Sequence, residues 1–137
     1  SGFLTDGTLE AQGADADGLL TTLHYADNLN SKRDQAFRLS YAKTYKMQPD
    51  VYAVQGYDAG QMLGIGLNAT KGDAKNIQGF AQAVRAAKID SPRGAFTMSK
   101  SHNPVQDIYL RKVVGKENVL EGVASKALVD PGLGCKM

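Results

Sequence analysis

Cysteine is scarce in this 137-residue chain, and neither positive nor negative charge is in large excess. Cys135 is the only cysteine, so no internal disulfide can form, and it has no companion residues at metal-ligand spacing. We expect either a free surface thiol or half of a disulfide to a cysteine outside this sequence. The formal net charge is +2, with no basic block, so nucleic acid is not an expected partner.

Long apolar runs are absent as well. No run approaches the roughly 20 residues that a membrane-spanning helix needs, and no signal peptide is recognisable. Hydrophobic residues make up 42% and charged residues 22% of the chain, which is typical of a globular domain or a piece of one.

Sequence signatures of catalysis are missing too. No serine stands in a Gly-x-Ser-x-Gly context, the glycines of residues 64–73 do not form a phosphate-binding loop, and the carboxylates are dispersed. His24 and His102 have no partner at metal-ligand spacing. We therefore expect neither an enzyme nor a metal or cofactor site.

Helical patterns occupy the middle of the chain. Ser31 predicts the start of a helix that runs to about residue 46, and Asp50 predicts the start of a second one to about residue 69. A third helix, over about residues 74–88, has the clearest amphipathic period. The first of these helices carries an aromatic stripe, for which a packing role is the usual interpretation: Phe37, Tyr41 and Tyr45.

Strand patterns flank these helices. A short helix over residues 5–17 precedes a mostly buried strand over residues 19–25. A β-like stretch at residues 95–99 leads to a hairpin with strands at residues 105–114 and 119–129. These strands are too few to be covered by three long helices, so we infer that part of the sheet lies outside this chain.

The stretch "PDVYAVQGYDAGQ", from Pro49 to Gln61, mixes packing and polar residues. Tyr52 and Tyr57 lie about 140° apart around a helix, so one ring can pack while the other faces a cleft. Gln55 lies three residues beyond Tyr52, close to the same face. An aromatic ring beside an amide suits a small ligand that has a flat apolar part and a polar group.

The chain resembles the type I periplasmic solute-binding proteins of ABC transporters, of the branched-chain amino acid-binding type. The resemblance rests on the aromatic helix that ends before Pro49, on "GYDA" from Gly56 to Ala59, and on the late segment "SPRGAFTMSKSHNPVQDIYLRKV". The ending "DPGLGCKM" is similar to the subgroup that binds aromatic acids such as benzoate derivatives.

The resemblance implies an α/β fold with two Rossmann-like lobes, of which this chain would be the C-terminal part and incomplete on its own. Residues 1–20 would belong to the second lobe, residues 21–127 to the first lobe with the crossing segments, and residues 128–137 to a tail that returns to the second lobe. The N-terminal part would be missing. Exposed sheet edges and apolar surface would then favour self-association.

The resemblance also implies a function. A small-molecule ligand would be captured between the lobes and delivered to the membrane permease of an ABC importer, without catalysis or cofactor. The protein would be periplasmic, or extracellular and membrane-anchored in a Gram-positive organism. The residues expected to contact the ligand are Gly2, Phe3, Tyr52, Tyr25 and Gln55.

Gly2 bears on the nature of the ligand. Relatives that bind amino acids carry an acidic residue in the loop that corresponds to Ser1–Phe3, and Gly2 with Phe3 predicts an aromatic, benzoate-like carboxylate instead. The alternatives are binding of a branched-chain or other amino acid, a ligand-sensing regulatory domain of the same fold, an α/β enzyme, and a purely structural domain.

Overall fold

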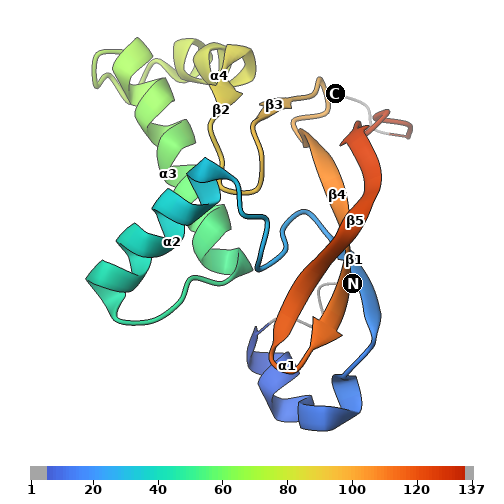
Figure 1. The fold of residues 1–137 in the computed structure, drawn as a ribbon. Coiled ribbons are helices and arrows are strands. Elements are labelled where there is room, and N and C mark those ends of the chain that lie inside the picture. The colour runs from blue at the N-terminus through green and yellow to red at the C-terminus, as the bar shows by residue number, and fades with distance from the viewer. Residues whose placement is uncertain (1–5, 135–137) are drawn as a thin grey trace.

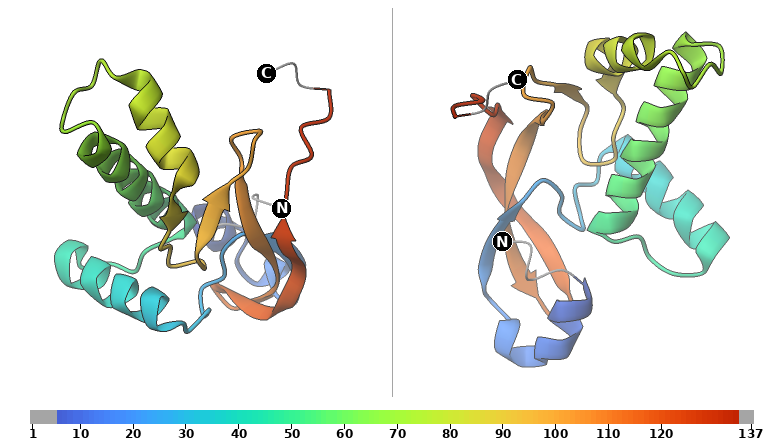
Figure 2. Two further views of the ribbon diagram at one scale, coloured as in Figure 1. Left: turned by 90° about the horizontal axis from the view of Figure 1, so that it is seen from above. Right: turned by 180° about the vertical axis from the view of Figure 1, so that it is seen from behind.

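The fold was analysed in a computed structural model, which describes residues 6–134. Figures 1 and 2 show α2, α3 and α4 gathered on one side and the β4–β5 hairpin with β1 on the other, with α1 at the turn end of the hairpin. The elements are α1 (Asp6–Gln12), a 3-10 turn (Gly13–Ala16), β1 (Leu20–Leu23), α2 (Lys32–Tyr45), α3 (Val51–Ala69), α4 (Ile77–Ala86), β2 (Lys88–Ile89), β3 (Phe96–Met98), β4 (Pro104–Val114) and β5 (Glu117–Leu128).

β4 is the centre of the sheet. β5 pairs along most of its length, and β1 pairs with residues 109–112 on the opposite edge. β3 pairs with the first residues of β4, and β2 with β3. All of these pairings are antiparallel, so the strands that the structure describes form no parallel sheet of their own. The predicted hairpin is confirmed, and Gly115 in its turn has a φ of 61°.

The helical side and the hairpin side of the molecule each contain a small hydrophobic cluster. Tyr25, Phe37, Val51 and Val54 pack where α2 and α3 meet the connection after β1. The second cluster packs α1 and the 3-10 turn against β4 near the hairpin turn, and its members are Leu9, Ala16 and Val113. Burial of each large apolar side chain contributes roughly 1.5–3 kcal/mol. The helical side and the hairpin side therefore each have a core of their own.

The helix predicted over residues 74–88 is shorter than expected. Asn76 caps α4 by accepting a hydrogen bond from the N–H of Gly79, and Ala87 already has an extended ψ of 147°. Lys88 and Ile89 form β2, which the sequence analysis missed. None of the residues of α4 is fully buried, and Ile77 is 73% exposed, because the amphipathic face contacts little except α3 and β3.

Three further expectations were wrong in detail. The first predicted helix is divided, because Gly13 has a φ of 57° and the chain continues as a 3-10 turn. The strand expected over residues 19–25 was predicted to be mostly buried, whereas β1 is shorter and Leu20 is 63% exposed. In the aromatic stripe of α2, Phe37 is buried but Tyr45 is 62% exposed.

Candidate functional site

Tyr52 lies in the first turn of α3. The start of this helix is fixed because Pro49 is buried and because the Asp50 carboxylate accepts a hydrogen bond from the N–H of Ala53 at 2.7 Å. The Tyr52 side chain is 60% exposed, which is unusual for a ring of this size. An accessible ring on a well-anchored helix start is what a ligand contact requires.

Gln55 lies one turn further along α3, and its side chain contacts His24. Gln55 Nε2 lies 3.3 Å from His24 Nε2, and His24 belongs to the connection that follows β1. Burial, with the nearby cations of Arg93 and Arg111, lowers the pKa of the His24 imidazole to about 4. His24 is therefore neutral at physiological pH and can donate or accept a hydrogen bond.

His24 was not among the predicted site residues. It lies 31 positions before Gln55 in the sequence, and no spacing pattern predicts a contact over that separation. Its place directly before Tyr25, one of the predicted contacts, was the only available signal.

Tyr25 is placed differently from the other candidates. Its side chain is 1% exposed, its hydroxyl donates a hydrogen bond to Asp34 Oδ1 at 2.9 Å, and the same hydroxyl accepts one from Arg38 at 3.2 Å. The backbone carbonyl of Tyr25 accepts a hydrogen bond from Arg111. Burial raises the pKa of its hydroxyl well above the usual range. These contacts favour a packing role, and the role of Tyr25 as a ligand contact stays a prediction.

Gly2 and Phe3 lie outside the described residues. The expectation that they approach the ligand from the lobe opposite Tyr52 therefore also stays a prediction. Among the candidates that are described, Tyr52 and Gln55 lie three residues apart on α3, Gln55 contacts His24, and Tyr25 is buried in the core.

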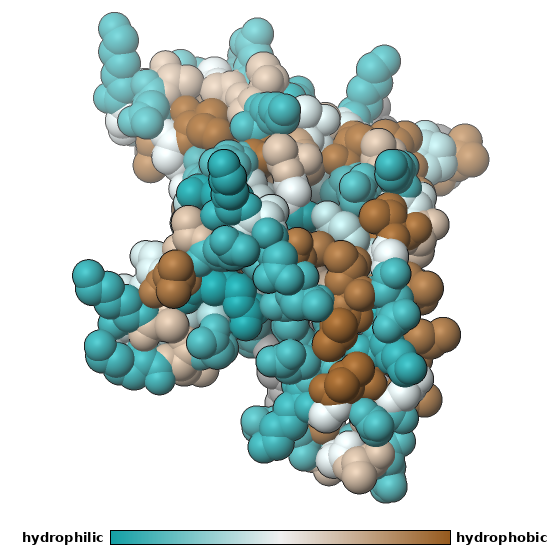
Figure 3. All heavy atoms as spheres, viewed as in Figure 1, coloured by the Kyte–Doolittle hydropathy of each residue, from teal (hydrophilic) through white to brown (hydrophobic). Residues whose placement is uncertain are grey.

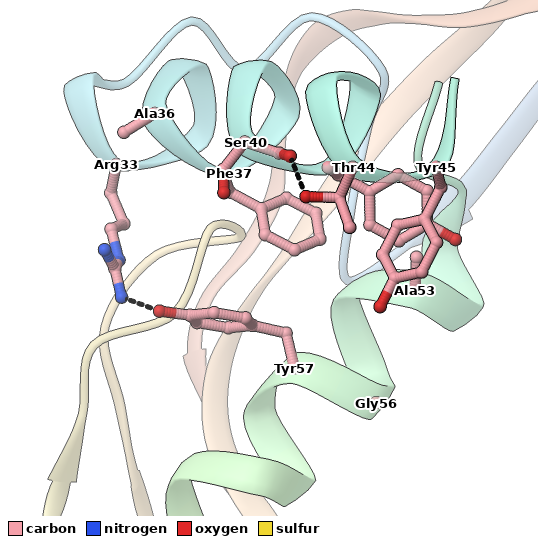
Figure 4. A pocket seen from close by; sticks show the side chains of 10 residues that line it. Arg33, Ala36, Phe37, Ser40, Thr44, Tyr45, Ala53, Gly56 and Tyr57 are labelled. Carbon is pink, nitrogen blue, oxygen red and sulfur yellow. Dashed lines mark hydrogen bonds between the residues drawn. The ribbon is translucent and has the colours of Figure 1, made fainter. Parts of the chain in front are cut away.

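A separate groove of about 510 Å³ lies between α2 and α3. Figure 4 shows the ring of Phe37 on α2 close to the ring of Tyr57 on α3, and Arg33 donating a hydrogen bond to the Tyr57 hydroxyl. The ring centroids of Phe37 and Tyr57 lie 5.1 Å apart. The groove is lined by Arg33, Ala36, Phe37, Ser40, Tyr41, Thr44, Tyr45, Ala53, Gly56 and Tyr57, and none of the predicted contact residues is among them. It borders the core cluster around Phe37, and we do not take it as the ligand site.

A buried ion pair joins α3 to the connection between β2 and β3. Asp58 of α3 accepts hydrogen bonds from Arg93 Nε at 2.8 Å and from the Ser91 hydroxyl at 2.9 Å. The two charged side chains are 4% and 8% exposed. Burial raises the pKa of the Asp58 carboxyl and lowers that of the Arg93 guanidinium, and their mutual attraction opposes both changes.

The sequence analysis did not single out Asp58, although a signal was present. Asp58 lies seven residues after Val51 and four after Val54, so it occupies a core position of the helix. A charge at such a position requires a buried partner of opposite charge. The partner, Arg93, could not be identified from spacing because it lies 35 residues away.

Among residues 6–134, no group of three or more metal-ligating side chains gathers at one point. In the same part of the chain, no helix combines the length and the apolar character that crossing a membrane would need.

Comparison with known proteins defines the class. The sequence profile of the periplasmic binding protein family matches residues 1–118. The chain therefore belongs to the periplasmic binding protein family, whose members bind ligands and are not enzymes. No curated protein matches the chain significantly.

Solved structures narrow the comparison to solute-binding proteins of ABC transporters. One from R. palustris in complex with benzoate is 46% identical, with a TM-score of 0.91, and the match covers 99% of this chain and 38% of that one. One from Rhodopseudomonas palustris BisB5 in complex with 3,4-dihydroxybenzoic acid is 30% identical, with a TM-score of 0.80 and coverage of 94% and 36%. One from Rhodopseudomonas palustris HaA2 in complex with p-hydroxybenzoic acid is 27% identical, with a TM-score of 0.82 and coverage of 95% and 37%.

These matches confirm the predicted fold class and its partial extent. The chain has a mixed α/β fold and spans little more than a third of the length of the structures that it matches.

Proposed function

We propose that the protein containing this chain is the ligand-binding component of an ABC importer and captures a small aromatic carboxylate of the benzoate type. The main support is the 46% identity, over 99% of this chain, to a solute-binding protein in complex with benzoate. The two further relatives described above are also complexes with hydroxylated benzoic acids. The exposed ring of Tyr52 is the feature of this chain that suits such a ligand.

In the proposed site, the ligand ring packs against Tyr52. Gln55 and the neutral His24 can hydrogen-bond a ring hydroxyl where the ligand is a hydroxylated benzoate. Gly2 and Phe3 approach from the opposite lobe, and the carboxylate is held by groups outside the described residues. Binding shifts the population of the two lobes toward the closed state and involves no bond-making step.

The domain boundaries and the cellular location belong to the same proposal. Residues 1–20 form part of the second lobe, residues 21–127 form the C-terminal part of the first lobe with the crossing segments, and residues 128–137 return to the second lobe. The protein acts in the periplasm, or outside the cell on a membrane anchor, and passes its ligand to the permease of the importer.

The proposal is tested by thermal unfolding of the longest gene product that contains residues 1–137. Benzoate, 4-hydroxybenzoate, leucine and valine are each added over a range of concentrations. The Tm is expected to rise with the logarithm of the benzoate concentration, because a ligand that binds only the folded state stabilises it in this way. A larger rise with leucine than with either aromatic acid would instead favour the amino acid alternative.

Tyr52 provides the matched test of the site. Tyr52→Ala is expected to weaken benzoate binding by roughly tenfold, since stacking of one aromatic ring contributes about 0.5–1.5 kcal/mol beyond the area it buries. Tyr45→Ala removes an equally exposed ring from α2, at 62% exposure, and should leave the affinity unchanged. Equal losses in both variants would argue against Tyr52 as the contact.

A further inference from the structure

Polar side chains of α3 join this helix to two connections of the sheet. Gln55 reaches His24 in the connection between β1 and α2, and Asp58 reaches Arg93 in the connection between β2 and β3. The two links lie three residues apart on the helix, so they hold neighbouring turns of α3 against the sheet. Figure 1 shows α3 standing beside these connections.

The connection between β2 and β3 is held by both long helices. Gln61 of α3 donates a hydrogen bond to the backbone carbonyl of Asp90 at 2.8 Å. Arg33 of α2 lies 3.1 Å from the carboxylate of the same residue. This segment is therefore a fixed part of the interface between the helices and the sheet.

Arg93 links three elements through one side chain and its carbonyl. Its guanidinium pairs with Asp58 of α3, donates to the side-chain oxygen of Gln106 on β4, and lies 4.3 Å from the centre of the Phe96 ring on β3. Its backbone carbonyl accepts a hydrogen bond from the Tyr109 hydroxyl at 2.6 Å.

The position of this cation is strongly determined. Leaving a buried charge unpaired costs free energy. Asp58 and Arg93 therefore stay paired when the elements that carry them move. The planar guanidinium bonds to Asp58 and Gln106 from different nitrogen atoms. A lysine ammonium has its three N–H donors on one nitrogen, so it cannot bond both partners from the two separate nitrogen positions that Arg93 uses.

We propose that Arg93 is a positioning residue for ligand binding, which sets the orientation of α3, and hence the place of Tyr52, relative to β4. Tyr52 lies six residues before Asp58, which corresponds to about 9 Å along the helix axis. A pivot of α3 about Asp58 would therefore displace the Tyr52 ring. The inference rests on the proposed function, in which this ring contacts the ligand.

The first test compares ligand affinities by titration calorimetry with benzoate, in the longest gene product that contains residues 1–137. Arg93→Lys is expected to weaken binding by roughly tenfold, the size typical of mutations that act through coupling rather than contact. Val113→Ala is the matched control, because it removes core volume near α1 without touching α3. It should lower the Tm while leaving the affinity unchanged, whereas an unchanged affinity in Arg93→Lys would overturn the inference.

The second test needs no ligand. Spin labels at Asn68→Cys on α3 and Glu121→Cys on β5, both exposed, report the distance between helix and hairpin in a Cys135→Ser background. Arg93→Lys should broaden or shift the distance distribution measured by pulsed electron resonance, and Val113→Ala should not. If the parent protein binds no aromatic acid, the proposed function fails, and the label distances still decide the role of Arg93.

A milder variant covers the case in which Arg93→Lys does not fold. Gln106→Ala removes the link to β4 but leaves the ion pair with Asp58 intact. It should change both the affinity and the label distances in the same direction as Arg93→Lys, by a smaller amount. Label distances identical to those of the parent in this variant would contradict the inference.

Discussion

At the scale of single residues, His24 carries a pH dependence that can be measured. Its folded-state pKa is about 4, against 6.5 in an unstructured chain, so the unfolded state binds more protons between these values. The stability contribution of neutral His24 is therefore complete above about 6.5 and is lost as the pH falls toward 4. Urea unfolding across this range should show a decline in the free energy of unfolding that His24→Gln removes.

Buried carboxylates also change the free energy of unfolding with pH, so the effect of His24 is measured as the difference between the parent and His24→Gln. Burial raises the pKa of Asp27, Asp34 and Asp58, and a raised carboxyl pKa favours the folded state as the pH falls, which opposes the effect of His24. These contributions are common to the parent and to His24→Gln, so they cancel in the comparison. Parallel pH profiles for the two proteins would show that His24 does not titrate with the lowered pKa.

The same residues show what a sequence can predict about a site. Asp50 was recognised as a helix cap and Tyr52 as a ring in the first turn, because both features depend on near neighbours in the chain. The contacts of Gln55 with His24 and of Asp58 with Arg93 join residues 31 and 35 positions apart. Such pairs are decided by tertiary packing, which leaves no local pattern.

At the scale of elements, two glycines of α3, Gly60 and Gly66, differ in the space that a Cβ atom would find. The aromatic ring of Phe80 on α4 occupies the space where a Cβ of Gly66 would stand, whereas a Cβ on Gly60 would meet nothing within 4 Å. Gly66→Ala is expected to destabilise the fold by about 1–3 kcal/mol, as overpacking does. Gly60→Ala should stabilise it by about 0.5–1 kcal/mol, since alanine is the better helix former.

These two substitutions are chemically identical and lie on the same helix, so each controls for the other. Chemical denaturation gives both free energies. Adding Phe80→Leu to Gly66→Ala should recover part of the loss, because a smaller side chain leaves room for the new methyl group. Stabilisation by alanine at both positions would show that α4 is free to move away from α3.

The elements also differ in how well their sequence patterns predict them. The bounds of α2 and α3 were predicted within about two residues, the usual uncertainty at helix ends, because Ser31 and Asp50 cap them and Pro49 separates them. The third helix was overestimated at both ends, because Asn76 caps α4 and because the amphipathic pattern continues through Ala87, which is extended, to Lys88, which belongs to β2. A helix period and a two-residue strand cannot be told apart over so short a stretch.

At the scale of the whole molecule, the chain spans little more than a third of the length of the solved structures that it matches. Its two small clusters hold the helical side and the hairpin side separately. Figure 3 shows apolar side chains in a band over the hairpin side of the molecule. The exposed apolar residues of the strands include Leu20 at 63%, Val123 at 45% and Leu128 at 49%.

Self-association of the isolated 137-residue chain follows from this surface. Among the described strands, β5 pairs only with β4. Asp27 and Asn28 bond the backbone of Asn118 and Leu120, so the part of the other edge that follows Leu120 offers backbone groups to a second copy beside the apolar side chains. The mass measured by sedimentation over a dilution series should therefore rise with concentration. Val123→Lys places a charge on β5 and should reduce the association, whereas Ile77→Lys on exposed α4, at 73% exposure, should not. A chain that stays monomeric at every concentration, or that loses its association equally in both variants, would show that the β5 edge is not where copies meet.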